Sequence, residues 1–199
     1  MAITTYAELQ TAIENWLARS DLNAYIPDFI TLFEATACRR LRVRLDETST
    51  TLTPSSGVAT LPTDLLGIRR VTWTGSPRQD LTYVHPIYFE ALFPDRADGT
   101  PANYTMEGTS LKVGPLSDTD LDVVYFARTA AVSGTLNWLF TKHPDAYLFG
   151  SLVEAEAFMK NDERAAMWRA RMEAIFDEIM MADFRERGHM HVRTMSATP

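Results

Sequence analysis

The sequence predicts a helix-dominated α+β protein: a helical bundle with an inserted small antiparallel β domain and an extended C-terminal tail. Apolar residues recur at helical spacing near both ends, in residues 1–43 and 136–187. Between them, residues 44–135 contain short apolar runs separated by turn residues, which is typical of strands. Residues 188–199 show neither pattern, and we expect an extended tail there.

Residues 1–43 are predicted to form two helices. Thr5 followed by Glu8 is the capping-box pattern, which satisfies free amide donors at the start of a helix. The second helix should begin between Asn23 and Pro27, because proline is tolerated in a first turn. The residues at helical spacing are Leu9, Ile13, Trp16 and Leu17 in the first helix, and Leu22, Ile26, Phe29, Ile30, Phe33, Ala37 and Leu41 in the second.

The middle section, residues 44–135, is predicted to be a small antiparallel β domain. Its turn residues Glu107-Gly108-Thr109 separate two short runs and indicate a hairpin. Pro86 should begin a short helix over Ile87–Ala97. The predicted strands are Thr50–Thr53, Gly57–Leu61, Leu66–Thr74, Leu81–Val84, Tyr104–Glu107, Ser110–Val113 and Leu121–Ala130.

Residues 136–187 are predicted to form an antiparallel helical hairpin. Pro144 and Asp145 suit the start of the first helix, and Asn161-Asp162 should separate it from the second. Gly150 lies inside the first helix, where glycine costs about 1 kcal/mol relative to alanine. We therefore expect a neighbouring helix or subunit to approach closely at Gly150.

Composition excludes several classes of protein. A formal net charge of −7 and a pI of about 5.1 argue against a nucleic-acid reader, because an acidic chain repels phosphate. The single cysteine, Cys38, excludes an internal disulfide and favours assembly in a reducing cytoplasm. No apolar run approaches the roughly 20 residues that span a bilayer, and no signal peptide is expected.

Motifs that carry catalysis, cofactors or metals are not found in the sequence. Glycine-rich phosphate loops and a G-x-S-x-G elbow are missing, so we predict no enzyme and no cofactor. His143 and Asp145 are acid–base residue types, but their position favours a helix start. Asp118-Thr119-Asp120 with Asp122 resembles half of a calcium loop, yet a turn entering a strand is favoured.

Two features of the helical sections predict contacts between subunits. The first is a group of arginines at the predicted end of the second helix, which suits both the helix dipole and intersubunit ion pairs; contact with nucleic acid is the alternative. The second is a set of methionines in the last helices that exceeds one stripe and suggests an oligomer interface. The predicted interface residues are Arg39, Arg40, Arg42, Met172, Ile179 and Met180.

The order and spacing of three stretches give the chain a family resemblance. The first stretch covers residues 6–42, the second 61–71 and the third 143–168, so together they span nearly the whole chain. They carry the segments Tyr6-Ala7-Glu8-Leu9, Trp16-Leu17-Ala18-Arg19-Ser20-Asp21-Leu22, Ile26-Pro27-Asp28-Phe29-Ile30, Arg39-Arg40-Leu41-Arg42, Leu61-Pro62-Thr63-Asp64-Leu65-Leu66-Gly67-Ile68-Arg69-Arg70-Val71, and His143-Pro144-Asp145-Ala146-Tyr147-Leu148-Phe149-Gly150-Ser151-Leu152 with Ala155, Asn161-Asp162 and Trp168. In these the chain resembles the head-to-tail adaptor proteins (head completion or tail accessory proteins) of short-tailed bacteriophages.

The resemblance implies a structural virion protein of the phage neck, assembled in the host cytoplasm. It implies a homo-oligomeric ring of twelve subunits, a dodecamer, under the portal protein. The ring would extend the channel used in DNA ejection and dock the tail nozzle and tail fibre proteins. It also implies that the C-terminal segment contacts the portal, through Arg187, His189, His191, Arg193 and Met195.

Physical reasoning adds a hypothesis for the lumen of the ring. Lysine and arginine would hold the phosphates of passing DNA, whereas an acidic lumen would let DNA slide without sequence-specific binding. Another neck or tail component, such as a stopper or tail-tube protein, is the nearest alternative. A small DNA-binding protein and a small helical enzyme are more distant ones. A metal site formed by a ring of His189 and His191 side chains is a further alternative to partner binding by the tail.

Overall fold

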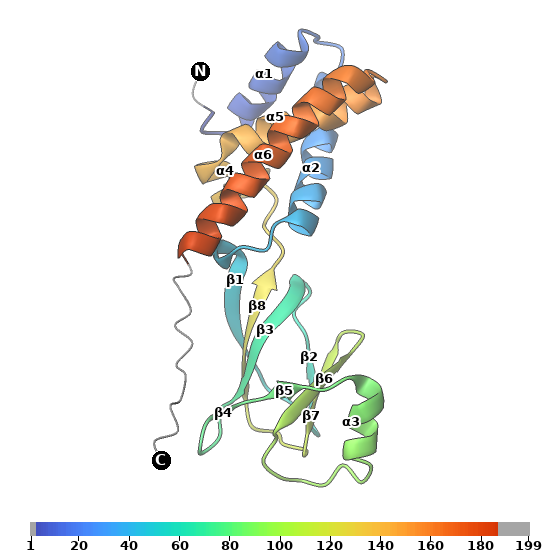
Figure 1. Ribbon diagram of the computed structural model, residues 1–199, viewed down its shortest axis with the longest axis vertical. Coiled ribbons are helices and arrows are strands. Elements are labelled where there is room, and N and C mark those ends of the chain that lie inside the picture. Colours follow the sequence, from blue (N-terminus) through green and yellow to red (C-terminus); the bar gives the residue numbers. More distant parts are fainter. Residues whose placement is uncertain (1–2, 187–199) are drawn as a thin grey trace, which may run out of the picture. The chain divides into compact units, whose positions relative to one another are not determined.

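The computed structural model describes residues 3–186 and is an α+β protein with 46% helix and 23% strand (Figure 1). The chain divides into two compact units, one helical and one mainly β. The β unit comprises Arg44–Arg128, and the helical unit comprises the described residues on either side of it. The fold class predicted from the sequence is thus confirmed, and each unit has a hydrophobic core of its own.

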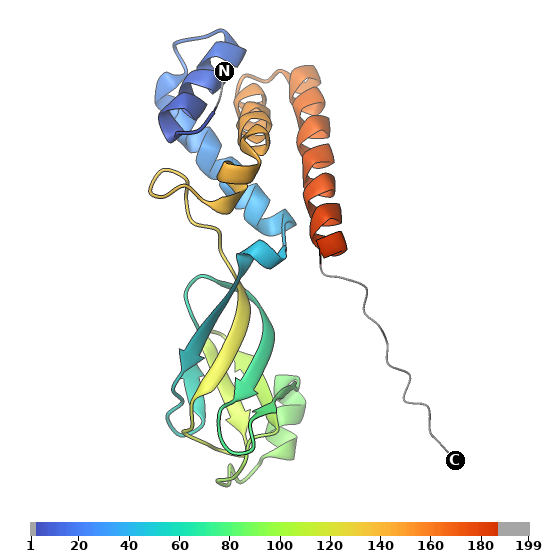
Figure 2. The same ribbon diagram turned by 90° about the vertical axis from the view of Figure 1, so that its left-hand side faces the viewer.

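The helical unit is built around α5, Pro144–Phe158, which is buried on nearly every side. Its close neighbours are the other long helices, and buried residues of all four long helices form one core. Figure 2 shows α6 running alongside α5 as the second arm of the predicted hairpin. The remaining elements are α1 (Tyr6–Leu17), η1 (Asn23–Tyr25), α2 (Ile26–Arg40), α4 (Trp138–Lys142) and α6 (Asp162–Glu186).

The predicted starts of two helices are confirmed. The Thr5 side chain accepts a hydrogen bond from the Glu8 amide at 3.2 Å, and the Glu8 carboxylate accepts one from the Thr5 amide at 3.0 Å. The pKa of the Glu8 carboxyl is held below its ordinary value, chiefly because the Thr4 hydroxyl and the Thr4 amide also donate hydrogen bonds to it. Helix α2 begins with Ile26 and Pro27, inside the predicted interval.

The close approach predicted at Gly150 is confirmed, and the neighbour is a helix of the same chain. The Phe33 ring of α2 lies over Gly150, so that a Cβ atom added there would lie 1.9 Å from Phe33 Cδ2. Phe33 itself is almost fully buried and contacts the rings of Tyr147 and Phe176. Glycine is required because only its missing side chain leaves room for the ring.

A buried polar network fixes the loop that precedes α4. The Tyr147 hydroxyl accepts a hydrogen bond from Asn137 Nδ2 at 2.6 Å and donates one to Glu34 at 3.1 Å. Glu34 also accepts a bond from the Val132 amide at 2.7 Å. Burial raises the pKa of the Tyr147 hydroxyl far above its ordinary value, so this hydroxyl stays protonated and keeps donating.

Removing that hydroxyl should weaken the helical unit. We expect Tyr147→Phe to lower the free energy of unfolding by about 1–3 kcal/mol, because the buried Asn137 amide and the half-buried Glu34 carboxylate each lose a hydrogen-bond partner. Urea unfolding measures the change. Tyr88→Phe is the matched control, since Tyr88 is exposed, and it should change stability by less than about 0.5 kcal/mol. Equal stabilities of the two variants would contradict the role given to the network.

The β unit consists of two four-stranded sheets that share one core. The strand orders are β1-β8-β3-β4 and β2-β7-β6-β5. Val71 and Val123 from the first sheet pack with Leu111 and Val113 from the second. The elements are η2 (Arg44–Asp46), β1 (Glu47–Leu52), β2 (Val58–Thr60), β3 (Leu65–Trp73), β4 (Gln79–Asp80), β5 (Thr82–Tyr83), α3 (Pro86–Leu92), β6 (Asn103–Glu107), β7 (Ser110–Gly114) and β8 (Leu121–Ala127).

The predicted hairpin is confirmed, but other details differ from the sequence prediction, including an earlier start of β1 at Glu47 and the additional strand β4. Strands β6 and β7 pair antiparallel around Gly108, whose φ is 58°. Strand β5, however, pairs parallel with β6, because the chain passes through α3 before β6 begins. Helix α3 ends at Leu92 and not at Ala97, since Pro94 disfavours helical backbone at the residue before it. Residues 129–135 lie in the helical unit, where Val132 is buried in the core.

Candidate functional site

The acid–base residues singled out in the sequence lie at a helix boundary. His143 follows α4 and precedes α5, with its ring 6.5 Å from that of Trp138. Asp145 is exposed in the first turn of α5. No group of three metal-ligating side chains occurs within residues 3–186, and His189 and His191 lie outside the described residues.

The carboxylates of the possible calcium loop are engaged in hydrogen bonds with the protein. Asp118 accepts a hydrogen bond from the Gly57 amide at 3.1 Å. Asp120 accepts one from the Thr53 hydroxyl at 2.7 Å, and Asp122 accepts one from the Thr51 hydroxyl at 3.0 Å. These aspartates therefore connect β8 and the turn before it to β1 and the residues that follow β1, as a turn entering a strand would.

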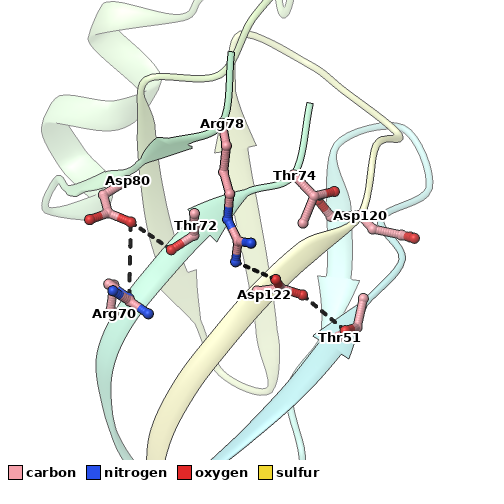
Figure 3. A network of polar contacts seen from close by, with 8 residues as sticks. All are labelled: Thr51, Arg70, Thr72, Thr74, Arg78, Asp80, Asp120 and Asp122. Atoms are coloured by element: carbon pink, nitrogen blue, oxygen red, sulfur yellow. Dashed lines mark hydrogen bonds and ion pairs between the residues drawn. The ribbon is translucent and has the colours of Figure 1, made fainter. Parts of the chain in front are cut away.

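The outer face of the β1-β8-β3-β4 sheet is a ladder of polar side chains (Figure 3). Arg78 pairs with Asp122 at 2.5 Å, and the Thr72 hydroxyl donates to Asp80 at 2.6 Å. Asp80 also lies 4.0 Å from Arg70. A depression of about 400 Å³ is lined here by Arg70, Thr72, Arg78, Gln79 and Asp80.

A second depression lies further along the same sheet. It measures about 530 Å³ and is lined by Glu47, Arg69, Arg70 and Val124. Arg69 pairs with Glu47 at 3.1 Å, and its guanidinium lies 6.0 Å from the centre of the Phe126 ring. Both depressions are open, and their charges are mostly neutralised by neighbours, which suits contact with another protein surface better than capture of a small molecule.

The arginines predicted to form a subunit interface have partners in their own chain. Arg39 donates to the Thr36 hydroxyl at 3.0 Å, and Arg40 pairs with Glu173 of α6. Arg42 donates to the Cys38 carbonyl. All three arginines are nevertheless exposed. A contact with a second subunit stays a prediction, while the predicted position of Arg39 and Arg40 at a helix end is confirmed.

The predicted apolar interface residues divide into two groups. Met172 and Ile179 are 4% and 5% exposed and belong to the core of their own chain. Their burial is explained without a second subunit. Met180 is only partly buried, and Met181 and Phe184 nearby are 62% and 78% exposed. Helix α6 thus does present apolar side chains outside its core stripe. Met181 belongs to the group of methionines noted in the sequence, whereas Phe184 is a residue that sequence reasoning missed.

Helix α3 carries an exposed apolar face that the sequence analysis also missed. Ile87, Tyr88 and Leu92 are 73%, 68% and 58% exposed, while Phe89 is buried beneath them. The signal was present in the sequence, because apolar residues occupy more than one side of this short helix. Glu90 at its rim pairs with Arg96 and Lys112, and its hydrogen bond with Arg96 is the main cause of the lowered pKa of this carboxyl.

These surfaces, and not a pocket, are the candidate functional sites of the described residues. The portal-contact residues predicted in the C-terminal segment, Arg187, His189, His191, Arg193 and Met195, lie outside the described residues. Among residues 3–186, no helix combines the length and apolar character needed to cross a membrane. The exposed apolar faces on α3 and α6 are surface features of the kind that mark contacts with other proteins.

Comparison with known families identifies the family of the chain. Residues 4–196 match the model of the SU10 adaptor protein family. The chain therefore belongs to this family of structural, phage head-to-tail adaptor proteins. A comparison with curated proteins finds no match.

Proposed function

We propose that the chain is one subunit of a ring that lies under the portal protein in the neck of the virion. The observation that carries this proposal is the family match over residues 4–196, since a head-to-tail adaptor must contact proteins on both sides of itself. A ring is the arrangement that leaves a central path for DNA. Twelve subunits, DNA passage during ejection, and docking of the tail nozzle and fibre proteins below are part of the same proposal.

Ring closure needs two different patches on each subunit, which meet around the ring axis. We assign one patch to the exposed side of α6, where Met181 and Phe184 supply apolar area and Met180 adjoins them. The exposed arginines Arg39, Arg40 and Arg42 are assigned to the same role, with Met172 and Ile179 supporting α6 from within the core. The apolar face of α3 is assigned to a tail protein, because exposed apolar patches of this kind mark protein interaction sites.

The lumen of the ring is proposed to be acidic. The net charge of −7 favours a channel that repels phosphate, so that DNA slides without being held. A ring with a strongly basic lumen would contradict this part of the proposal.

The C-terminal segment is proposed to anchor the ring to the portal. Residues 187–199 contain Arg187, His189, His191 and Arg193 but no acidic residue. Such a segment can order on binding to an acidic groove of a partner. Met195 would add an apolar contact.

Deleting residues 188–199 should abolish capping of the portal. We expect electron microscopy of the full chain mixed with its portal to show a ring on one end of the portal particle. The shortened chain should leave portals bare at the same concentration. The control is a chain in which the order of residues 188–199 is shuffled. It keeps Arg39, Arg40 and Arg42, and its length and charge are those of the full chain. Portals capped by the shortened chain would overturn the anchor, and bare portals with the full chain would overturn the adaptor proposal itself.

The nearest alternative is a different neck component, such as a stopper or a tail-tube protein. The helix content of 46% against 23% strand favours the adaptor over a mostly β tail-tube protein. Salt-dependent binding of duplex DNA by the purified chain would instead favour a small DNA-binding protein.

A further inference from the structure

One edge of the β unit differs from the other three. The two sheets have four edge strands, and in the described residues β4, β5 and β2 span only two, two and three residues. Strand β1 is the exception, with six residues that pair with β8 in an unbroken register. A free edge of this length offers a row of backbone amides and carbonyls to an additional strand.

Strand β1 also lacks the features that usually protect an edge. Glu47–Leu52 contains no lysine, no proline and no bulge, and Thr48, Ser49 and Thr51 are exposed. Toward the other edge of the same sheet, β4 pairs with only two residues of β3, and β3 carries Arg69 and Arg70 and has two register shifts against β8. One edge of the sheet is therefore irregular and charged, whereas the other is regular and open to pairing.

The charge around the open edge specifies what could pair with it. Along the second half of β1, Thr51 donates to Asp122, and Thr53 donates to Asp120. Asp118 lies in the same turn, and Arg78 is the cation that pairs with Asp122. Asp122 is already paired with Arg78, whereas Asp118 and Asp120 accept hydrogen bonds only from uncharged donors within residues 3–186. These two carboxylates favour an incoming strand with basic side chains near this end of β1.

The C-terminal sequence of the chain has this pattern. His189, His191 and Arg193 alternate with Met190, Val192 and Thr194. In an extended strand these two sets point to opposite faces. The basic set would lie toward the aspartates, and the other set would lie on the side of the half-buried Thr50 and Leu52.

We infer that residues 189–194 of a second copy of the chain add to the β1 edge as an extra strand. This inference rests on the proposed ring, because the donor is a neighbouring subunit. Thirteen residues follow Glu186, which is enough chain for a six-residue strand of roughly 20 Å with residues to spare on either side. The same segment is the proposed portal contact, so the portal and β1 compete for it. In this inference β1 binds the segment until the ring assembles on the portal.

Peptide binding tests the strand pairing directly. The probe is a synthetic peptide of residues 187–199, and the receptor is a chain that ends at Glu186, which keeps every core residue of both units. We expect hydrogen exchange at residues 47–52 to slow when the peptide binds. An added strand uses only every second amide of the peptide to pair with β1. Two modified peptides are therefore compared, one N-methylated at residues 189, 191 and 193 and the other at residues 190, 192 and 194. One of them should bind about tenfold more weakly or worse, and the other should lose much less affinity.

The full chain tests whether the donor is a second copy. We expect association that rises with concentration and is lost when residues 188–195 are shuffled at constant composition, which keeps the charge and removes the alternation. Equal effects of both N-methylated sets, or unchanged exchange at β1, would overturn the pairing. A full chain that stays monomeric while β1 is protected would place the strand within one chain and overturn the second copy as donor. Failure of portal capping would leave these readouts unaffected, so the two proposals can fail separately.

Discussion

Replacing Gly150 with alanine is expected to lower the free energy of unfolding by about 3 kcal/mol. Alanine normally stabilises a helix interior by about 1 kcal/mol relative to glycine, so propensity alone predicts the opposite sign. The added Cβ, however, would lie 1.9 Å from Phe33 Cδ2 and 2.3 Å from Phe33 Cε2. Phe33 is held by the Tyr147 and Phe176 rings, so α2 and α5 must move apart. The clash therefore outweighs the helix propensity.

Urea unfolding of four variants, Gly150→Ala, Gly134→Ala, Phe33→Ala and Gly150→Ala with Phe33→Ala, separates the clash from other effects. Gly134→Ala, in a loop of the same unit, is the control, because its Cβ would meet only the Ala131 carbonyl at 3.9 Å. We expect it to stay within about 0.5 kcal/mol of the parent chain. The double variant with Gly150→Ala and Phe33→Ala should lose much less stability than the two single variants combined, because without the Phe33 ring the added Cβ has nothing to clash with. A Gly150→Ala chain as stable as the parent would refute the account of the α2–α5 contact.

Features set by neighbouring residues could be predicted from the sequence. The Thr5–Glu8 capping box depends on bonds within one helical turn, and the hairpin at Gly108 depends on a turn between adjacent strands. Gly150 could be recognised as a place of close approach because it breaks a local preference. The sequence did not identify Phe33 as the neighbour, since the α2–α5 contact joins residues far apart in the chain.

Features that depend on distant residues could not be predicted. The parallel pairing of β5 with β6 and the free edge at β1 follow from the order of strands in the sheets. The same holds for Met172 and Ile179, whose place on an apolar stripe fits both a core and a subunit interface. Ile87 and Tyr88 are apolar residues that would be expected in the core but are exposed. Phe89 of the same helix takes the buried position, which the sequence alone does not show.

Removing Arg164 is the second change from which we expect a large effect. Glu156 lies on α5 with its side chain 0% exposed, and Arg164 Nε of α6 lies 2.9 Å from Glu156 Oε1. Within residues 3–186 no well-oriented hydrogen bond reaches either oxygen, so the ion pair is the main compensation for the buried charge. Breaking a buried pair from one side typically costs about 3–5 kcal/mol. Arg164→Ala should lie at the low end, about 3 kcal/mol, because the arginine side chain is 44% exposed.

Two further variants test whether the cost comes from the unpaired carboxylate. Arg169→Ala is the control, because Arg169 is exposed on the same helix, and it should change stability by less than about 0.5 kcal/mol. Adding Glu156→Met to Arg164→Ala removes the charge and keeps most of the volume, so the double variant should regain most of the lost stability. If the double variant were less stable than Arg164→Ala alone, the loss would come from packing of the arginine stem against α5. The buried carboxylate would then owe its stability to the surrounding helices and not to its ion pair.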